Sequence, residues 1–223
     1  MSGRAQRLRV TYARGEELKY VAHLDMMRFW ERALRRAQIR VAYSVGFSPH
    51  AQISLGAPLS VGITGRAELM DVFLGEPLPP EEFRERLQSQ LPTGVVVVAV
   101  EEVAISEPSV QSQLRATDYE LRLGTEADLD AVARVVSAFL AAETFPWEHI
   151  REKQTKRYDL RPLVLELRLE RRPDGGVLVT RLRAEEAGTG RPDQLAAALG
   201  LSDRIVHVER IGLVLANSAL ANG

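Results

Sequence analysis

Arginine recurs along one short segment of the chain, at Arg28, Arg32, Arg35 and Arg36. The planar guanidinium donates two parallel hydrogen bonds to a phosphate and does not lose its charge near neutral pH. On a helix turning 100° per residue, the four side chains fall within an arc of about 100°. The spacing suits the backbone of a nucleic acid, and a solvated helix face partly neutralised by Asp25 and Glu31 is the alternative.

A loop with almost no charge follows this segment, from Tyr43 to Pro58, and His50 is its one ionisable side chain besides the tyrosine. We expect this loop to expose Phe47, because it follows the end of a short strand. Exposed aromatic rings near arginines stack on unpaired bases in many RNA-binding proteins. The alternative is that Phe47 and Ile53 pack under the loop as a small additional core.

Two histidines, His23 and His50, could act as general acid–base groups, because imidazole titrates near neutral pH. Either would make the chain an RNA endonuclease or an RNA-modifying enzyme. His23 precedes Asp25 by two positions, but no third ligand has a fixed spacing, so we predict no metal site. We expect His23 to cap the N-terminus of the helix instead, and we assign no catalytic residue.

A second basic cluster lies far along the chain and contains Lys153, Lys156, Arg157 and Arg161. Its segment has no clear periodicity, so no helix or strand is assigned to it. The cluster could extend the anion-binding surface of the arginine segment. A solvated connector is an equally good interpretation.

Charge is unevenly distributed along the 223 residues, although the net charge is only −1. Residues 1–50 contain ten basic and four acidic side chains, a local net charge of +6, and residues 66–110 have a local net charge of −6. A neutral total therefore does not exclude a polyanionic ligand. Pairing between oppositely charged segments that touch in the fold is the alternative.

Composition excludes several classes of protein. The sequence contains no cysteine, which rules out disulfides, zinc–thiolate sites and cysteine-ligated iron–sulfur clusters in this chain. No stretch approaches the roughly 20 apolar residues of a membrane span, and the N-terminus does not resemble a secretory signal. We therefore expect a cytoplasmic protein. No P-loop or dinucleotide-binding glycine motif is present, and we predict no cofactor.

Apolar periodicity predicts an α+β protein. In the first half the expected order is β-α-β-β-α-β, with a strand at 8–12, a helix at 23–38, strands at 40–44 and 68–74, a helix opened by Pro79 and Pro80, and a strand at 95–103. A polar segment, 106–117, is the best candidate for a linker. We expect a first domain at 1–106.

The same order is expected in the second half. Its elements are a strand at 119–123, a helix capped by Thr125, a hairpin of 163–170 with 177–182, a short helix at 192–199 and a strand at 205–215. The two halves together predict tandem ferredoxin-like domains, 1–106 and 117–223, which could pack as one unit. This fold hosts many functions and indicates none.

Three motifs in the first sixty residues carry a family resemblance. They are Tyr-x-x-His-Leu-Asp from Tyr20 to Asp25, Glu-Arg-Ala-Leu-Arg-Arg from Glu31 to Arg36, and Gly-Phe-x-Pro-His with Gly46, Phe47, Pro49 and His50. With them the chain resembles the radical-SAM-linked protein family, a domain of unknown function. Weaker similarity continues at Tyr158–Pro162 and Arg191–Pro192. Ala22 and Ser48 stand where the family pattern has Ser and Asn.

The resemblance implies a partner, a radical SAM protein fused to such a domain or encoded beside it. This chain is not itself expected to be a radical SAM enzyme, because the cluster of such enzymes requires cysteines. Family members are often encoded near ribosomal-protein and ribonuclease genes, which favours RNA as a ligand. In the family motifs we expect Tyr20, His23, Asp25, Gly46 and Pro49 to shape the site.

The leading hypothesis is a non-catalytic module that binds tRNA or rRNA and presents it to a radical SAM enzyme. The expected contacts are Arg28, Arg32, Arg35, Arg36, Phe47, His50, Lys153, Lys156, Arg157 and Arg161. The alternatives are an RNA endonuclease or modifying enzyme, and a protein-interaction domain that docks on the radical SAM enzyme. The sequence predicts no oligomeric state.

Overall fold

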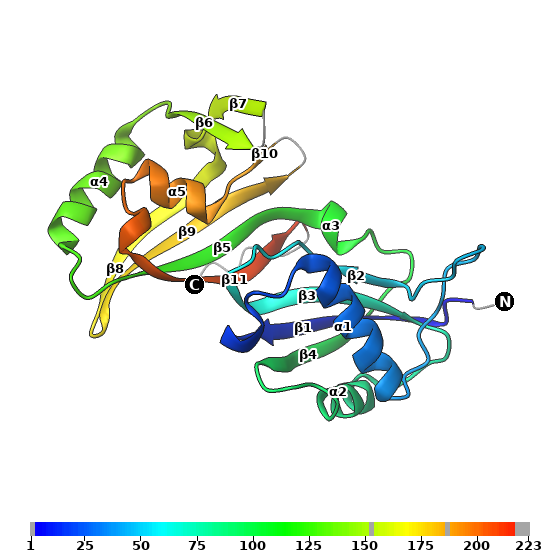
Figure 1. Ribbon diagram of the computed structural model, residues 1–223. Coiled ribbons are helices and arrows are strands. Elements are labelled where there is room, and N and C mark those ends of the chain that lie inside the picture. The colour runs from blue at the N-terminus through cyan, green and yellow to red at the C-terminus, as the bar shows by residue number, and fades with distance from the viewer. Residues whose placement is uncertain (1–2, 152–153, 186–187, 217–223) are drawn as a thin grey trace. The chain divides into compact units, whose positions relative to one another are not determined.

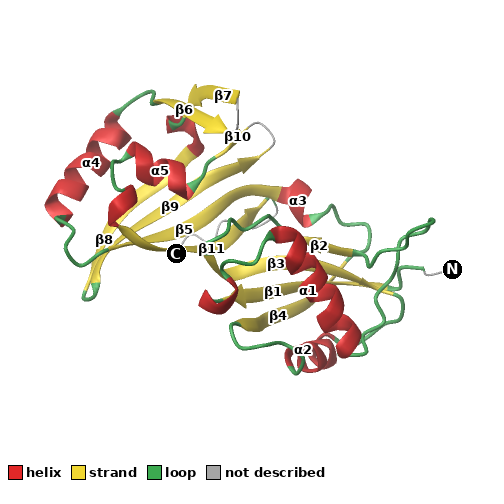
Figure 2. Cartoon of the chain, viewed as in Figure 1, coloured by secondary structure: helices red, strands yellow, loops and turns green. Residues whose placement is uncertain are grey.

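A computed structural model describes residues 3–151, 154–185 and 188–216 and confirms the predicted α+β class. The described part contains five α-helices and a large amount of β-sheet (Figures 1 and 2). The chain divides into two compact units. Among the described residues, the first takes in 3–114 together with 215–216, and the second is Arg115–Val214.

The first unit is a four-stranded antiparallel sheet with helices. Its elements are β1 (Gln6–Arg14), η1 (Glu16–Leu18), α1 (His23–Arg36), β2 (Ile53–Leu55), β3 (Thr64–Leu74), α2 (Pro80–Gln88), β4 (Val95–Val103) and α3 (Val110–Gln113). The spatial order of its strands is β2-β3-β1-β4, and all three pairings are antiparallel. The element order predicted for the first half is thus present.

Alternation along β1 sorts its side chains onto two different surfaces. Leu8, Val10 and Tyr12 are buried in the same core as Trp30 of α1 and Phe83 of α2. Burying one large apolar side chain contributes about 1.5–3 kcal/mol, so this core is what fixes α1 on the sheet. The arginines between those core positions lie on the opposite face of the strand.

That opposite face holds a buried ion cluster. Arg7 and Arg9 both pair with Asp71 of β3, at 2.5 Å and 2.9 Å, and all three side chains are largely buried. Burial opposes the charge of Arg9, but its hydrogen bond to Asp71 and the charge of that carboxylate outweigh burial and raise the pKa of Arg9. These arginines therefore serve the fold of the first unit.

The strand predicted at 40–44 is wrong. Gln38 adopts a left-handed backbone with φ 56°, which ends α1 and turns the chain, so that only two isolated bridges form in this segment. They join Val41 to Leu74 and Tyr43 to Ala51. The second strand of the unit lies later, at β2, beside β3.

The segment 106–117 is not the structureless linker that we expected. Ser109 caps α3 by accepting a hydrogen bond from the backbone N–H of Ser112, and Val110 is fully buried. The next strand begins directly at Leu114, where the two units divide. Polar composition misled the prediction, because a single buried valine, Val110, anchors the helix in this otherwise mostly polar stretch. The limits 1–106 and 117–223 stay predictions.

The second unit contains the remaining elements. They are β5 (Leu114–Leu123), α4 (Leu129–Ala141), β6 (Pro146–Arg151), β7 (Gln154–Asp159), η2 (Arg161–Leu163), β8 (Val164–Arg172), β9 (Gly175–Glu185), β10 (Gly188–Thr189), α5 (Pro192–Ala198), η3 (Ser202–Arg204) and β11 (Ile205–Leu215). The main strand order is β8-β9-β5-β11, with β8, β9 and β5 paired antiparallel. The strands β6 and β7 form a separate two-stranded sheet.

Tandem ferredoxin-like domains are not evident from this arrangement. The β6–β7 hairpin interrupts the second unit between α4 and β8, in the segment to which the sequence assigned nothing, and β10 adds a further short strand to β9. The cap expected at Thr125 is also displaced. Asp128 caps α4 instead, and the N–H groups of Ala131 and Asp130 that bond to its carboxylate lower the pKa of Asp128.

Among the described helices, none combines the length with the apolar composition that crossing a membrane would require.

Candidate nucleic-acid interface

The four arginines of α1 are all exposed, but they differ in whether their guanidinium groups already have a partner within the protein. Arg28 pairs with Asp25 one turn earlier, at 3.1 Å. Arg36 donates a hydrogen bond of 2.9 Å to the backbone oxygen of Gln90, which follows α2. In the described part of the chain, Arg32 and Arg35 make no side-chain hydrogen bond and no ion pair. These two are therefore the guanidinium groups available to a ligand.

The Gly-Phe-Ser-Pro-His loop is closed at its base by a pair of residues. The hydroxyl of Ser44 accepts a hydrogen bond from the backbone N–H of His50 at 3.1 Å and lies 2.9 Å from the ring nitrogen Nδ1 of His50. The backbone N–H of Ser44 donates to the carbonyl of His50 at 2.9 Å. Between them Gly46 has φ 145°, which a side chain would strain. The loop is therefore pinned at its base.

The tip of this loop projects its apolar side chains outward. Phe47 has a relative exposure of 110% and Val45 one of 97%. Ile53 is buried, as the packing alternative expected, but Phe47 does not join it. An exposed ring of this kind loses no internal packing when it stacks on a base.

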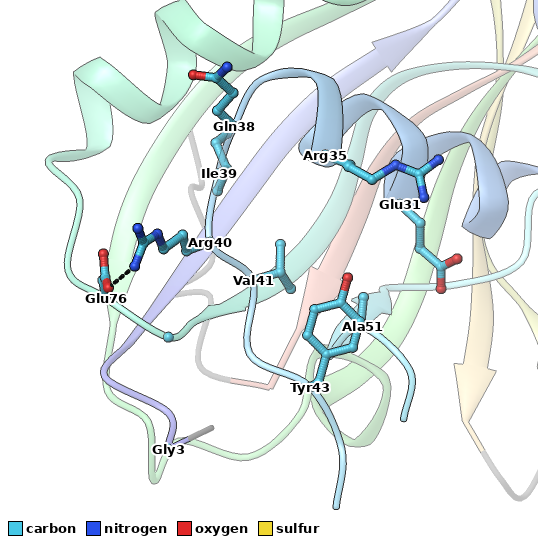
Figure 3. A pocket seen from close by; sticks show the side chains of 11 residues that line it. Gly3, Glu31, Arg35, Gln38, Ile39, Arg40, Val41, Tyr43, Ala51 and Glu76 are labelled. Atoms are coloured by element: carbon cyan, nitrogen blue, oxygen red, sulfur yellow. Dashed lines mark hydrogen bonds and ion pairs between the residues drawn. The ribbon is translucent and has the colours of Figure 1, made fainter. Parts of the chain in front are cut away.

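A pocket of about 540 Å³ lies between the end of α1 and the segment that leads into the loop (Figure 3). It is lined by Gly3, Glu31, Arg35, Gln38, Ile39, Arg40, Val41, Tyr43, Ala51, Gly75 and Glu76. Arg40 forms an ion pair with Glu76, drawn as a dashed line in the figure. The pocket is thus bordered both by Arg35, an unpaired guanidinium of α1, and by residues at the base of the loop.

A second hollow, of about 510 Å³, is lined by His50 and also by Ala51, which borders both hollows. The guanidinium carbon of Arg4 lies 4.1 Å above the centre of the Phe73 ring, and its Nε donates to the amide oxygen of Gln52 at 2.7 Å. His50 therefore lines one of the two concave surfaces, next to the residue that they share, and it is exposed.

The prediction that His23 caps α1 is wrong, because Ala22 occupies the capping position and no side chain bonds there. His23 is the first residue of the helix and borders a cavity of about 10 Å³, together with Tyr12, Arg14 and Glu68. That volume corresponds to about one water molecule. His23 and His50 line different hollows, so the structure does not join them in one site.

The other residues of the first family motif lie on the surface. Tyr20 is 71% exposed, and the ammonium of Lys19 lies 5.3 Å from the centre of its ring. Asp25 binds Arg28 and makes no hydrogen bond to His23 in the described structure. In the part of the chain that the structure describes, no group of acidic residues and histidines is placed to hold a metal.

The second basic cluster belongs to the second unit, and Lys153 lies outside the described residues. Lys156 is exposed on β7, and Arg157 pairs with Glu148 of β6 at 2.5 Å. Arg161 donates to the carbonyl oxygens of Val164 at 3.0 Å and Leu140 at 3.3 Å. The role of this cluster in binding remains a prediction.

The neighbouring motif residues organise the end of β7. The carboxylate of Asp159 accepts hydrogen bonds from the backbone N–H of Phe145 at 2.8 Å and of Arg161 at 3.0 Å. The hydroxyl of Tyr158 donates to the side chain of Gln194 at 2.6 Å, and burial raises the pKa of Tyr158. These motif residues are therefore explained by their structural role, which is to hold the end of β7 in place within the second unit.

Of the residues that line the 540 Å³ pocket, sequence reasoning expected only Arg35 as a ligand contact, and it missed polar or aromatic ones such as Glu31, Gln38, Arg40 and Tyr43. A signal was present in Arg40, which continues the basic run beyond the helix, and in the tyrosine that opens the loop. The turn at Gln38 brings them together, and its sequence has no glycine to announce a left-handed backbone.

Comparison with solved structures gives distant similarities, of which one is the following. A chain of "Crystal Structure of a Cbf5-Nop10-Gar1 Complex" aligns with a TM-score of 0.49 at 10% sequence identity. The alignment covers 94% of this chain and 49% of that one, so the present chain spans about half of its length. No curated protein matches the sequence.

A family model matches the chain from residue 7 to residue 192, which covers most of each of the two units described above. All three motifs of the first sixty residues lie within this match, as do Tyr158–Pro162 in the second unit. The chain therefore belongs to DUF2344, the family described as "Uncharacterized protein conserved in bacteria".

Proposed function

We propose that this chain is a non-catalytic RNA-binding module that presents tRNA or rRNA to a radical SAM enzyme. One observation carries the proposal: Phe47 is fully exposed at the tip of a loop whose base is pinned by Ser44 and His50. Stacking of a base on such a ring is worth about 1–3 kcal/mol, and a pinned loop loses little entropy on binding.

Charge near the loop supports RNA over an uncharged ligand. Arg32 and Arg35 are exposed on α1 and have no partner in the described structure, and Arg35 lines the pocket at the base of the loop. Each phosphate that they neutralise releases condensed counterions, so affinity would fall as salt rises. An exposed stacking ring and unpaired guanidinium groups in one unit suit single-stranded RNA.

The radical SAM partner is proposed from the family resemblance in Tyr20–Asp25, Glu31–Arg36 and Gly46–His50. Because the chain contains no cysteine, the cluster would belong to another polypeptide segment. In this proposal the chain holds the RNA in the cytoplasm and the partner performs the difficult chemistry.

We also propose that each unit is a modified ferredoxin-like domain. The strand orders β2-β3-β1-β4 and β8-β9-β5-β11 correspond to each other, with one helix after the first strand and one before the last. The β6–β7 hairpin and β10 are then additions to the second copy. An experimental structure with β2 or β8 away from β3 or β9 would contradict this assignment.

The RNA proposal is tested by titrating fluorescein-labelled tRNA and rRNA fragments against the wild type and the double variant Arg32→Glu/Arg35→Glu. We expect the double variant to lose at least about tenfold in affinity at low salt. Arg134→Glu is the matched control, because Arg134 is also exposed on a helix and lies in the second unit. Equal, salt-insensitive binding by all three proteins would exclude an RNA-binding role for α1.

A second candidate is an RNA endonuclease or RNA-modifying enzyme. It is favoured by the position of His23, which borders a small cavity together with the buried Glu68 and Arg14. This candidate predicts turnover of pooled RNA by the isolated chain, abolished by His23→Ala with the fold intact. Absence of any cleaved or modified product would leave the non-catalytic role.

A third candidate, a domain that docks on the radical SAM enzyme, is favoured by exposed apolar side chains beside His23. Tyr20, Leu24 and Val61 are 71%, 69% and 57% exposed, and the N–H of Gly62 donates to the carbonyl of Lys19 at 2.8 Å. Co-purification with the enzyme that survives nuclease treatment, and is lost in Leu24→Asp, would support docking over RNA.

A further inference from the structure

The 540 Å³ pocket has the size of a site for one nucleotide, since ligand pockets of about 300–1,000 Å³ enclose molecules of this class. It is formed within the first unit, by residues of α1 and of the segment that leads into the loop. Figure 3 shows Glu31, Arg35 and Tyr43 along one side of it and the Arg40–Glu76 pair along the other. One side therefore carries its free charges and its aromatic ring.

Glu31 and Glu76 are the two carboxylates of this pocket, and they differ in one respect. Glu76 is neutralised by Arg40, whereas Glu31 has no side-chain hydrogen bond or ion pair among the described residues. Arg35 lies one helical turn after Glu31, yet the two do not pair within 4.0 Å. A free carboxylate and a free guanidinium thus line one hollow, each with its hydrogen-bonding capacity unused.

Tyr43 gives the same side of the pocket an aromatic surface. Its backbone is bridged to Ala51, which fixes its position at the base of the loop, and its side chain is 45% exposed. A half-exposed ring on a fixed backbone can stack on a planar base at small entropic cost.

From these features, and resting on the proposed RNA-binding function, we infer that the pocket binds one unpaired guanine of single-stranded RNA. The Watson–Crick edge of guanine presents two adjacent donors, N1–H and the N2 amino group, which match the two oxygens of the Glu31 carboxylate. Adenine, cytosine and uracil each lack such a pair of donors. Tyr43 supports the face of the base, and Arg35 binds a neighbouring phosphate.

The arrangement requires the base to be unpaired, because pairing would occupy the edge that Glu31 reads. Phe47 at the loop tip then stacks on an adjacent base of the same strand. The paired Arg40 and Glu76 form the opposite wall, where Arg40 is already neutralised and contributes less to phosphate binding. The ligand class is therefore a guanine-containing single strand, and a fully paired duplex is disfavoured.

The test uses the full chain and a series of labelled single-stranded oligonucleotides that differ at one central position, which is guanine, inosine or adenine. Inosine lacks only the N2 amino group of guanosine, so this comparison removes one donor from the ligand without any change in the protein. We expect guanine to bind about tenfold more tightly than inosine or adenine, the usual effect of a hydrogen bond to a charged group. The duplex form of the guanine strand should bind more weakly than the single strand.

The variant Glu31→Gln sharpens the test, because its amide replaces one acceptor oxygen by a donor. It should reduce binding of the guanine strand about tenfold and leave the adenine strand unchanged. Glu85→Gln is the control, with the same change of charge at an exposed glutamate of α2 in the same unit. RNA binding without a preference for guanine, or a preference that persists in Glu31→Gln, would overturn the inferred guanine site but not the proposed binding of RNA. Absence of binding to every strand would overturn the proposed function as well.

Discussion

Two regions of this protein are rich in basic residues, and they use their charges differently. In the first unit, Arg35 of α1 opens onto a pocket and has no partner in the described structure. In the second, Arg161 donates to two backbone carbonyls, and Arg157 pairs with Glu148. The two regions look alike in a count of charges, yet among the described residues only the first leaves guanidinium groups without a partner.

This difference shows what a run of arginines in a sequence does and does not indicate. A guanidinium has five donors, and it stabilises whichever acceptors the fold brings close. Near Arg161 those acceptors are the carbonyls at the end of α4 and the start of β8. Among the described residues no acceptor lies within bonding distance of Arg35, which makes the first region the better candidate for an external anion.

The largest expected effect is on RNA affinity when the exposed ring is removed. Phe47→Ala should weaken binding of single-stranded RNA by about 1–3 kcal/mol, because one base loses its stacking surface. The thermal unfolding midpoint should not change, since the ring is fully exposed. Fluorescence anisotropy and a melting curve on the same sample measure both. An unchanged affinity would remove the loop from the interface.

The second prediction compares how much an arginine of each region contributes to the stability of the fold. Arg161→Ala should lower the free energy of unfolding by about 2 kcal/mol, because the carbonyls of Val164 and Leu140 lose a charged donor. Arg35→Ala should change it by less than about 0.5 kcal/mol. Urea unfolding, monitored by circular dichroism, measures the free energy of unfolding of the two variants. If Arg35→Ala were the more destabilising, the contrast between the regions would be wrong.

A smaller effect tests whether pinning the loop matters. Ser44→Ala removes the hydroxyl that joins the two ends of the loop, to which His50 bonds. We expect RNA affinity to fall by about 1 kcal/mol, because the loop must then be ordered on binding. Ser48→Ala, at an exposed position of the same loop, is the control and should bind as the wild type does. Equal losses in the two variants would mean that the bond is unimportant.

Much of the fold could be predicted from periodicity. The strands β4 and β11 have the predicted limits, because their apolar residues alternate or cluster and clear turn residues flank them. The helix α1 was recognisable from its buried stripe, although it ends two residues before the predicted limit. What failed depended on single residues: Val110 anchors α3, and Gln38 takes a left-handed backbone.

The site was only partly predictable, for a related reason. Helical spacing was enough to expect Arg32 and Arg35 on an exposed face, but not to know that Arg28 and Arg36 would find partners. The partner of Arg36 is the carbonyl of Gln90, 54 positions along the chain. Hydrogen bonds over such separations follow from tertiary packing, which local pattern does not contain.

The most direct test of an RNA-binding α1 is the salt dependence of affinity for a single-stranded RNA, measured for the wild type, Arg32→Glu/Arg35→Glu and Arg134→Glu. For the wild type we predict that the logarithm of the affinity falls linearly with the logarithm of the salt concentration. In the double variant the magnitude of this slope should be smaller by about 1–2, because each lost phosphate contact lowers the slope by about 0.7. Arg134→Glu should keep the wild-type slope. Identical slopes for all three proteins would contradict the account.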